Sequence, residues 1–339
     1  MNILIIGNGF DLSHYLPTKY EHFMLVMQAI EKKDITKPVS NAYYYPSNNL
    51  LNGMIKAYMV YKVFDNQSYQ MNFDALFSKF TKSQDKIFIV NTKQHYDTSK
   101  IFLEFNQIFD IQSKLKKNSW YEYFKNHIKE IDTWIDFETK IEDLLVVLAQ
   151  CITKINLAEV DHNELSGLAE VVSSKEIKVL SFFDLFNEYS GRVKINDKYV
   201  MTPTSLSINA KFCYGKSSEN EFNPNEFLRI IQKQLDEFIQ IFNLYLELIV
   251  DKLEPNTQFK IESKDWVQPD HIFSFNYTNT FRKLYESKVK AEFLHGRFGE
   301  EQNIVLGVSD LEDESLRKLK AYGFTKYHQK LFKDTRLPS

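Results

Sequence analysis

Three short segments of the chain carry the residue types that could do chemistry. Gly7, Asn8 and Gly9 form the first segment, Asn276 lies in the second, and His295-Gly296 forms the third. Each of them follows a short apolar run. In an open α/β sheet, ligands bind beyond the carboxyl ends of the strands. The positions of these segments therefore predict one site that the two ends of the chain form together.

Glycine is scarce in this chain, so its positions are informative. The chain has 10 glycines among 339 residues, against a usual share of about 7%. Five of them lie in or just after predicted strands, at Gly7, Gly9, Gly296, Gly299 and Gly307. Glycine permits a positive φ and lets a phosphate approach backbone N–H groups, so the first pair predicts a phosphate-binding turn. A turn that serves packing alone is the alternative, because Leu12 stands where a dinucleotide loop has its third glycine.

Asn276 and His295 are the candidate catalytic residues. An asparagine offers both a donor and an acceptor, so Asn276 could hold a ribose hydroxyl or a water molecule. Histidine is the commonest general base near neutral pH, which suits His295 at the end of a strand. Asn276 could instead cap the following helix, although Thr278 and Asn279 suit that role better. His295 could have a purely structural role.

Metal chemistry has little support in the sequence. HxxxH and HExxH patterns, Cys/His clusters, GxSxG and the phosphate-binding GxxxxGK[ST] pattern are all absent. Four carboxylates follow one another closely, at Asp136, Glu138, Glu142 and Asp143. They could bind magnesium, but their spacing fits a solvated acidic face in the first turns of a helix better. We therefore expect no metal.

Charge and composition limit the kinds of partner that the protein is expected to bind. With 42 Lys+Arg against 45 Asp+Glu, the net charge of −3 lacks the basic field of a protein that wraps nucleic acid. Lysines are interleaved with aromatic residues over 114–125. This pattern is more typical of the solvated face of a helix than of a nucleic-acid-binding site. Two distant cysteines, no signal-peptide pattern and no long apolar run predict a cytoplasmic protein without a membrane partner.

The elements that must position the site are strands at both ends of the chain. Residues 3–6 are continuously apolar, which predicts a strand buried on both faces. A loop is expected through residue 18, followed by a helix over 19–32. Further strands are expected at 271–275, 291–294 and 303–308, with a helix at 280–287 between the first two. This order predicts an α/β fold with a Rossmann-like parallel sheet formed by residues 1–33 and 256–339.

The middle of the chain, residues 34–255, reads as a large, mostly helical insertion with a regulatory or specificity role. Its first part, 34–100, is polar and without a clear period; 100–150 is helical; and 195–215 forms short strands or a hairpin. Residues 225–253 predict a long helix that starts near Pro224 and stops before Pro255. Its apolar stripe fits a central packing helix, with a coiled-coil dimer seam as the alternative. A homo-oligomer is therefore a possible state.

Several motifs resemble the bacteriophage abortive-infection AbiH family. They are residues 5–12 continuing to 16–20, residues 134–138, residues 275–278, and Leu294-His295-Gly296. Phe324-Thr325-Lys326-Tyr327 resembles the start of a further family segment. The resemblance spans residues 3 to about 330 and implies cytoplasmic antiviral defence in a bacterium, with a phage-derived trigger of unknown nature.

A more distant similarity is to sirtuin-like NAD-binding proteins. Their G-x-G-x-S-x-x-x-G-[IL]-P loop matches residues 7–17, with Asp11 in place of the serine and Tyr15 in place of the last glycine. Thr278 stands where an aspartate is frequent. The resemblance implies that Asn276 orients ribose and water and that His295 is the base. It also implies an NAD-binding set made of Gly7, Asn8, Gly9, Phe10, Asp11, Pro17, Thr278 and Gly296.

These observations predict an antiphage protein that binds NAD or a related nucleotide and cleaves its N-glycosidic bond. A non-catalytic sensor of a nucleotide or phage protein is the main alternative. A metal-dependent nuclease that uses Asp136 and Glu138 is a weaker one.

Overall fold

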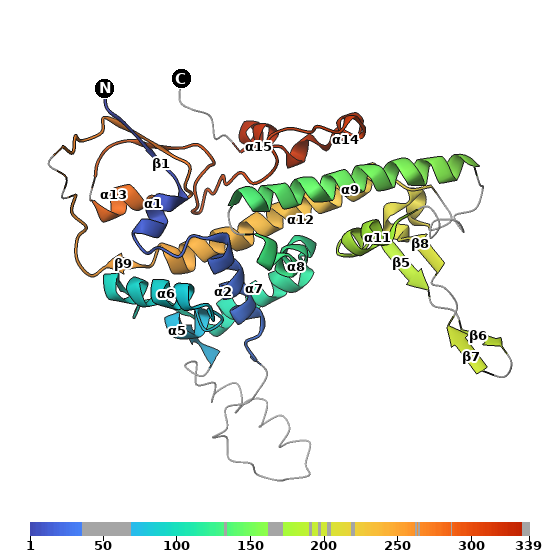
Figure 1. Cartoon of the computed structure of the whole chain (residues 1–339), viewed down its shortest axis with the longest axis horizontal. Helices are drawn as coiled ribbons and strands as arrows, with labels where there is room; N and C mark the ends of the chain where they lie inside the picture. The colour runs from blue at the N-terminus through green and yellow to red at the C-terminus, as the bar shows by residue number, and fades with distance from the viewer. Residues whose placement is uncertain are drawn as a thin grey trace, which may run out of the picture.

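The computed structural model describes most of the chain, apart from several segments in its middle and at its end (Figure 1). The described residues are 1–35, 69–131, 134–161, 172–189, 192–195, 198–201, 205–217, 221–261, 263, 265–285 and 287–333. Residues 36–68, about half of the polar segment 34–100, therefore lie outside the described residues. The described chain is a mixed α/β structure, more than half of it helical.

The two ends of the chain meet in one small parallel sheet. Its strands are β1 (Ile3–Ile6), β10 (His271–Ser274) and β11 (Ala291–Phe293), in the order β1-β10-β11. Ile5 is in register with Phe273, and Phe273 with Glu292. Helix α13 (Thr280–Leu284) connects β10 to β11. The predicted strand–helix–strand unit and its pairing with the amino-terminal strand are confirmed.

Two predictions about this sheet are wrong. Residues 303–308 form no strand; only Val308 makes an isolated bridge. Instead, the amide side chain of Gln329 bonds the backbone N–H and carbonyl of Leu306 at 3.0 and 2.8 Å, so these groups are satisfied without a strand partner. β1 is also not buried on both faces, since Ile5 is 65% exposed while Ile6 is 6% exposed. Among the described residues, only the face that packs on Phe281 is covered.

The segment after β1 begins with a short helix, where a loop is expected. Helix α1 (Asn8–Ser13) starts directly after Gly7, whose φ of −139° is extended backbone. Neither Gly7 nor Gly9 adopts a positive φ. Tyr15 does, with φ of 59°, at the position where the sirtuin-like loop has a glycine. The chain then enters α2 (Tyr20–Glu31), which confirms the predicted helix.

Helices make up the body of the molecule. The principal ones are α6 (Ser83–His95), α7 (Phe105–Lys117), α8 (Ser119–Asn126), α9 (Trp134–Asp161), α11 (Ser174–Ser181), α12 (Pro224–Tyr245), α14 (Glu314–Lys318) and α15 (Lys326–Phe332), with a short α5 (Phe73–Leu76). A five-residue π-helix (Leu246–Val250) extends α12. Figure 1 shows α9 and α12 lying along the long axis, with α14 and α15 on one side and α2 and α5–α8 on the other.

Short antiparallel pairs complete the fold. The expected strands near 195–215 are β7 (Lys198–Met201), which pairs with β6 (Arg192–Ile195), and β8 (Ser205–Ile208), which pairs with β5 (Phe186–Tyr189). Two-residue strands pair elsewhere: β2 (Met71–Asn72) with β4 (Phe102–Leu103), and β3 (Tyr96–Asp97) with β9 (Glu254–Pro255).

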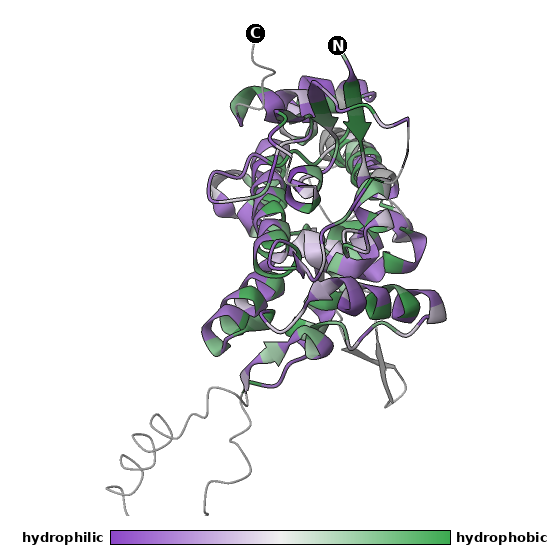
Figure 2. Ribbon diagram, turned by 90° about the vertical axis from the view of Figure 1, so that its left-hand side faces the viewer, coloured by the Kyte–Doolittle hydropathy of each residue, from purple (hydrophilic) through white to green (hydrophobic). Residues whose placement is uncertain are grey.

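Helix α12 is the centre of the core, as its periodicity predicts. Pro224 occupies its first turn, and the Asn223 side chain caps it by accepting from the Glu226 N–H at 3.2 Å. All eight residues of the predicted stripe are buried: Leu228, Ile231, Leu235, Phe238, Phe242, Tyr245, Ile249 and Leu253. The helices in Figure 2 alternate between hydrophobic and hydrophilic colours along their length, as amphipathic helices do. The stripe therefore packs within the chain rather than forming a dimer seam.

Trp120 shows how α8 is fastened to α12. Its indole is completely buried, and its N–H donates to the carbonyl of Ile231 at 2.7 Å. Tyr121 is also fully buried. The aromatics of the 114–125 stretch are therefore core residues and are not available to stack on nucleic-acid bases.

One hydrophobic core contains residues from both parts of the predicted division at 33/34 and 255/256, for example Phe23 of α2 and Phe238 of α12. Their rings meet edge to face at 5.7 Å. The α/β class and the parallel pairing are confirmed. The division into domains and the kinship to Rossmann-like or sirtuin-like folds remain predictions. No helix among the described residues has the length and apolar character needed to cross a membrane.

Candidate functional site

A cavity of about 290 Å³ lies at the carboxyl ends of all three strands of the parallel sheet. It follows β1 at Asn8 and Asp11, β10 at Asn276 and Thr278, and β11 at His295. Helices α9 and α15 and the end of α12 close the rest of it. The remaining lining residues are Thr18, Glu138, Phe242, Leu246, Phe275, Tyr277 and Lys326. The predicted segments from both chain ends are thus brought to one place, where a parallel sheet usually binds its ligand.

Asp11 is the buried anchor of this site. It is 1% exposed, and its two carboxylate oxygens accept from Asn276 Nδ2 at 2.8 Å and Thr278 Oγ1 at 2.5 Å. Thr280 Oγ1 in turn donates to Thr278 Oγ1 at 3.0 Å. Burial raises the pKa of Asp11 from 3.8 to about 6, although the hydrogen bonds lower it. Asp11 therefore positions other side chains, because both of its oxygens are engaged by them.

The carboxylate determines which atom of Asn276 faces the cavity. An ionised carboxylate only accepts hydrogen bonds, so the amide nitrogen of Asn276 must face Asp11, and its oxygen is left for a ligand. Asn8 has the opposite arrangement, because its amide oxygen accepts from Thr18 Oγ1 at 2.7 Å and its amide nitrogen remains. The cavity thus offers one acceptor and one donor from two fixed amides, which is the pattern that a pair of hydroxyls can satisfy.

His295 enters the cavity as a neutral imidazole. Burial, together with the positive charges of Lys326 and Lys330, lowers its pKa from 6.5 to about 4. Its ring meets Phe275 edge to face at 5.5 Å. Within the part of the chain that the structure describes, neither ring nitrogen has a hydrogen-bond partner. A neutral imidazole with a free ring nitrogen can accept a proton from a bound water or hydroxyl.

An ion pair between Glu138 of α9 and Lys326 of α15 forms one wall of the cavity. Both oxygens of Glu138 lie 2.6 Å from Lys326 Nζ, and the side chains are only 20% and 17% exposed. Burial raises the pKa of Glu138, while the lysine opposes that effect. This pair is not among the catalytic and NAD-binding residues predicted from the sequence. The sequence nevertheless marks both residues, because Glu138 lies in the 134–138 family motif and Lys326 in the 324–327 motif.

Five of the predicted binding residues lie outside the cavity lining. Phe10 packs on His14 and Phe281 instead, with ring centroids 4.4 and 5.9 Å apart. The carbonyl of Pro17 accepts from Tyr245 Oη at 2.5 Å. Gly296 has φ of 79°, and a Cβ there would lie 2.0 Å from the Asn303 carbonyl oxygen, so it shapes the turn that follows His295.

The loop glycines Gly7 and Gly9 also lie outside the lining, but the space beside them is open. A Cβ on either would meet no atom within 4 Å. A ligand could therefore approach this backbone closely, although neither Gly7 nor Gly9 has the positive φ that was expected. A binding role for these glycines remains a prediction.

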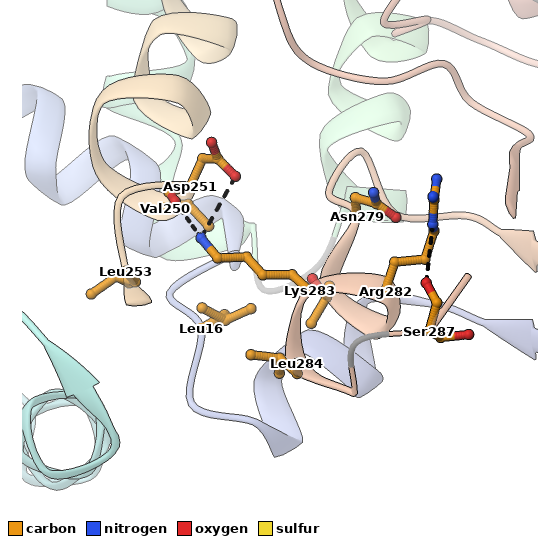
Figure 3. Close-up of a pocket in the computed structure, with 10 residues that line it drawn as sticks. Leu16, Val250, Asp251, Leu253, Asn279, Arg282, Lys283, Leu284 and Ser287 are labelled. Atoms are coloured by element: carbon orange, nitrogen blue, oxygen red, sulfur yellow. Dashed lines mark hydrogen bonds and ion pairs between the residues drawn. The ribbon is translucent and has the colours of Figure 1, made fainter. Parts of the chain in front are cut away.

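A second, larger cavity of about 420 Å³ lies beside α13 and the end of the π-helix (Figure 3). Its most prominent charged group, Lys283, bonds the carbonyl of Asp251 and lies 3.3 Å from Glu254 Oε1. Arg282 donates to the Ser287 carbonyl at 3.4 Å. The cavity contains none of the residues predicted for chemistry, so the smaller cavity is the candidate functional site.

Comparison with known families identifies the chain. A family model described as bacteriophage abortive infection AbiH matches residues 3–337. The chain belongs to the AbiH family. Membership indicates a role in defence against bacteriophage. No curated protein and no solved structure matches this AbiH chain.

The AbiH motifs noted in the sequence converge on the cavity. Asn8 and Asp11 come from the first, Glu138 from the second, Asn276 and His295 from the third, and Lys326 from the last. In the described ranges, no three His, Cys, Asp or Glu side chains are grouped to hold a metal ion. Since Glu138 is paired with Lys326, the arrangement gives no support to a metal-dependent nuclease built on Asp136 and Glu138.

Proposed function

We propose that this AbiH protein binds NAD or a related nucleotide in the 290 Å³ cavity and cleaves its N-glycosidic bond during antiphage defence. The observation that carries the proposal is the pairing of an oriented Asn276 with a neutral His295 at the carboxyl edge of a parallel sheet. The cavity volume is near the lower end of the range for ligand pockets. It suits the base and ribose of a nucleotide, with the phosphates extending outward.

The polar groups match the needs of a ribose. Its two neighbouring hydroxyls can donate to the amide oxygen of Asn276 and accept from the amide nitrogen of Asn8. Both amides are held by buried or half-buried partners, so little freedom is lost when a ligand binds. Asp11 supports this arrangement from behind without contacting the ligand.

The reaction needs one proton acceptor and no metal. The bond between ribose C1′ and the base nitrogen breaks, and its electron pair goes to the base. A water oxygen bonds to C1′, and His295 accepts the proton that this water releases. Because its pKa lies near 4, His295 is available as a base throughout the neutral range.

The test is release of nicotinamide from NAD by the purified protein, with and without phage lysate to supply a trigger. We expect release that His295→Ala and Asn276→Ala abolish, and loss of protection against phage in cells that carry these variants. His127→Ala, which changes a histidine on a different part of the chain, is the control. If no nicotinamide appears under any condition and His295→Ala still protects, the proposal is wrong. Tight NAD binding without turnover would assign the protein a sensor role instead.

A further inference from the structure

The charges that line the cavity are unequal. Two carboxylates, Asp11 and Glu138, face one ammonium group, Lys326, and burial keeps His295 neutral at pH 7. Aromatic rings occupy much of the remaining lining, at Phe242, Phe275 and Tyr277. The lining residues alone carry one more negative than positive charge, although Lys330 also acts on His295, and the aromatic walls add attraction for a cationic ligand.

Of the two carboxylates, only Glu138 is placed to meet a ligand. Asp11, which bonds Asn276 and Thr278, is only 1% exposed and so is not accessible to a ligand. Glu138 lines the cavity and keeps 20% of its side chain exposed. Lys326 Nζ contacts both of its oxygens, which favours the ionised carboxylate against the opposing effect of burial and fixes its orientation.

We infer that Glu138 recognises positive charge on the substrate, first on the quaternary nitrogen of an oxidised nicotinamide ring and then on the ribosyl group as the bond breaks. This inference rests on the proposed function and narrows its substrate to a nucleotide with a cationic base. Lys326 is a positioning residue in this scheme.

The charge follows the bond that breaks. The electron pair of the C1′–N bond neutralises the ring nitrogen, so the positive charge passes to C1′ and the ring oxygen of the ribose. Water then adds at C1′, and its proton goes to His295. A fixed carboxylate that faces this path stabilises the developing cation without having to reorganise. Half-burial strengthens the attraction, because fewer water molecules screen it.

A purely structural role is the competing explanation, since the ion pair also joins α9 to α15. The two explanations differ in what happens to ligands of equal shape and unequal charge. Oxidised and reduced nicotinamide dinucleotides are such a pair, because the ring of the reduced form carries no positive charge. A structural role predicts equal losses for both.

The experiment measures dissociation constants for oxidised and reduced dinucleotide by calorimetry in a His295→Ala background, which prevents turnover. Glu138→Gln keeps the shape of the side chain and removes its charge. We expect about tenfold weaker binding of the oxidised form and unchanged binding of the reduced form, in line with the energy of a partly desolvated charge contact. Glu142→Gln, an exposed acid one turn away on α9, is the matched control and should change neither.

Each outcome is decisive. Equal weakening for both dinucleotides, or no weakening for either, overturns the inference and leaves the proposed function intact. If neither dinucleotide binds the His295→Ala protein, the proposed function fails together with the inference. In the enzyme with His295 present, Glu138→Gln should lower kcat by about 100-fold with a smaller change in KM, as removal of a group that stabilises transition-state charge does.

Discussion

Replacement of Asp11 by Asn should stabilise the fold at neutral pH while it damages the site. Asp11 is buried and has its pKa raised from 3.8 to about 6. The unfolded chain releases this proton near pH 4, whereas the folded chain keeps it until about pH 6. Between these values the folded state binds more protons, so the contribution of Asp11 to the free energy of unfolding falls as pH rises.

The size of this effect follows from the shift of about two pKa units. At about 1.4 kcal/mol per unit, ionised Asp11 lowers the stability of the fold by about 3 kcal/mol at pH 7 relative to its protonated form. Asp11→Asn has nearly the same shape and no charge. Its oxygen can accept from Asn276, and its nitrogen can donate to Thr278 Oγ1. After allowing about 1–2 kcal/mol for weaker hydrogen bonds, we expect a gain of about 1–2 kcal/mol at pH 7.

The assay is urea unfolding of both proteins at half-unit steps from pH 4.5 to 8. The free energy of unfolding of the variant should exceed that of the natural protein above pH 6, and this difference should shrink as pH falls towards 4.5. Asp265→Asn, at an exposed aspartate, is the control and should show no such trend. A difference that stays constant over the whole range would refute the reasoning. Ligand binding should weaken in Asp11→Asn, because Asn276 is no longer held by a carboxylate.

Three further predictions follow from other contacts. Lys326→Met should raise the pKa of His295 above about 4, because it removes one of the positive charges that lower it; an imidazole pKa that does not rise in an NMR titration would contradict this. Trp120→Phe should cost about 2 kcal/mol in urea unfolding, since it leaves a gap in the core and removes a buried hydrogen bond. Gly296→Ala should lower the melting temperature, because the added Cβ clashes with the backbone of Asn303. Gly9→Ala should not lower it, because Gly9 lies in helix α1 and its added Cβ meets open space. Equal melting temperatures for the two alanine variants would show that the turn after His295 can adjust.

Local patterns made α12 and the parallel sheet predictable from the sequence. The stripe on α12 needs only its own periodicity to identify the buried face, and all eight of its members are in the core. The strands at 3–6, 271–274 and 291–293 follow from short apolar runs that end at glycine, serine or histidine. An apolar run also predicted a strand at 303–308, and that prediction is wrong because the side chain of Gln329 bonds the backbone of Leu306 in place of a neighbouring strand.

The candidate site was predictable only in part, for a related reason. Asn276 and His295 stand at strand ends, so topology alone brings them to one edge of the sheet. Glu138 and Lys326 lie on helices 188 positions apart, and only the packing of α9 against the end of the chain brings them together. The left-handed backbone at Tyr15 was likewise hidden, because a tyrosine rarely adopts it.

The order in which the cavity is assembled has a consequence for the cell that makes this protein. Its lining begins at Asn8 and ends at Lys326, so the first lining residue leaves the ribosome long before the last one. Domains fold in step with synthesis, from the amino terminus onward. No partial chain that ends before α15 can have the Glu138–Lys326 wall. A cell therefore holds no complete candidate site until translation has passed α15, and a stop codon before α15 is expected to leave the site without this wall.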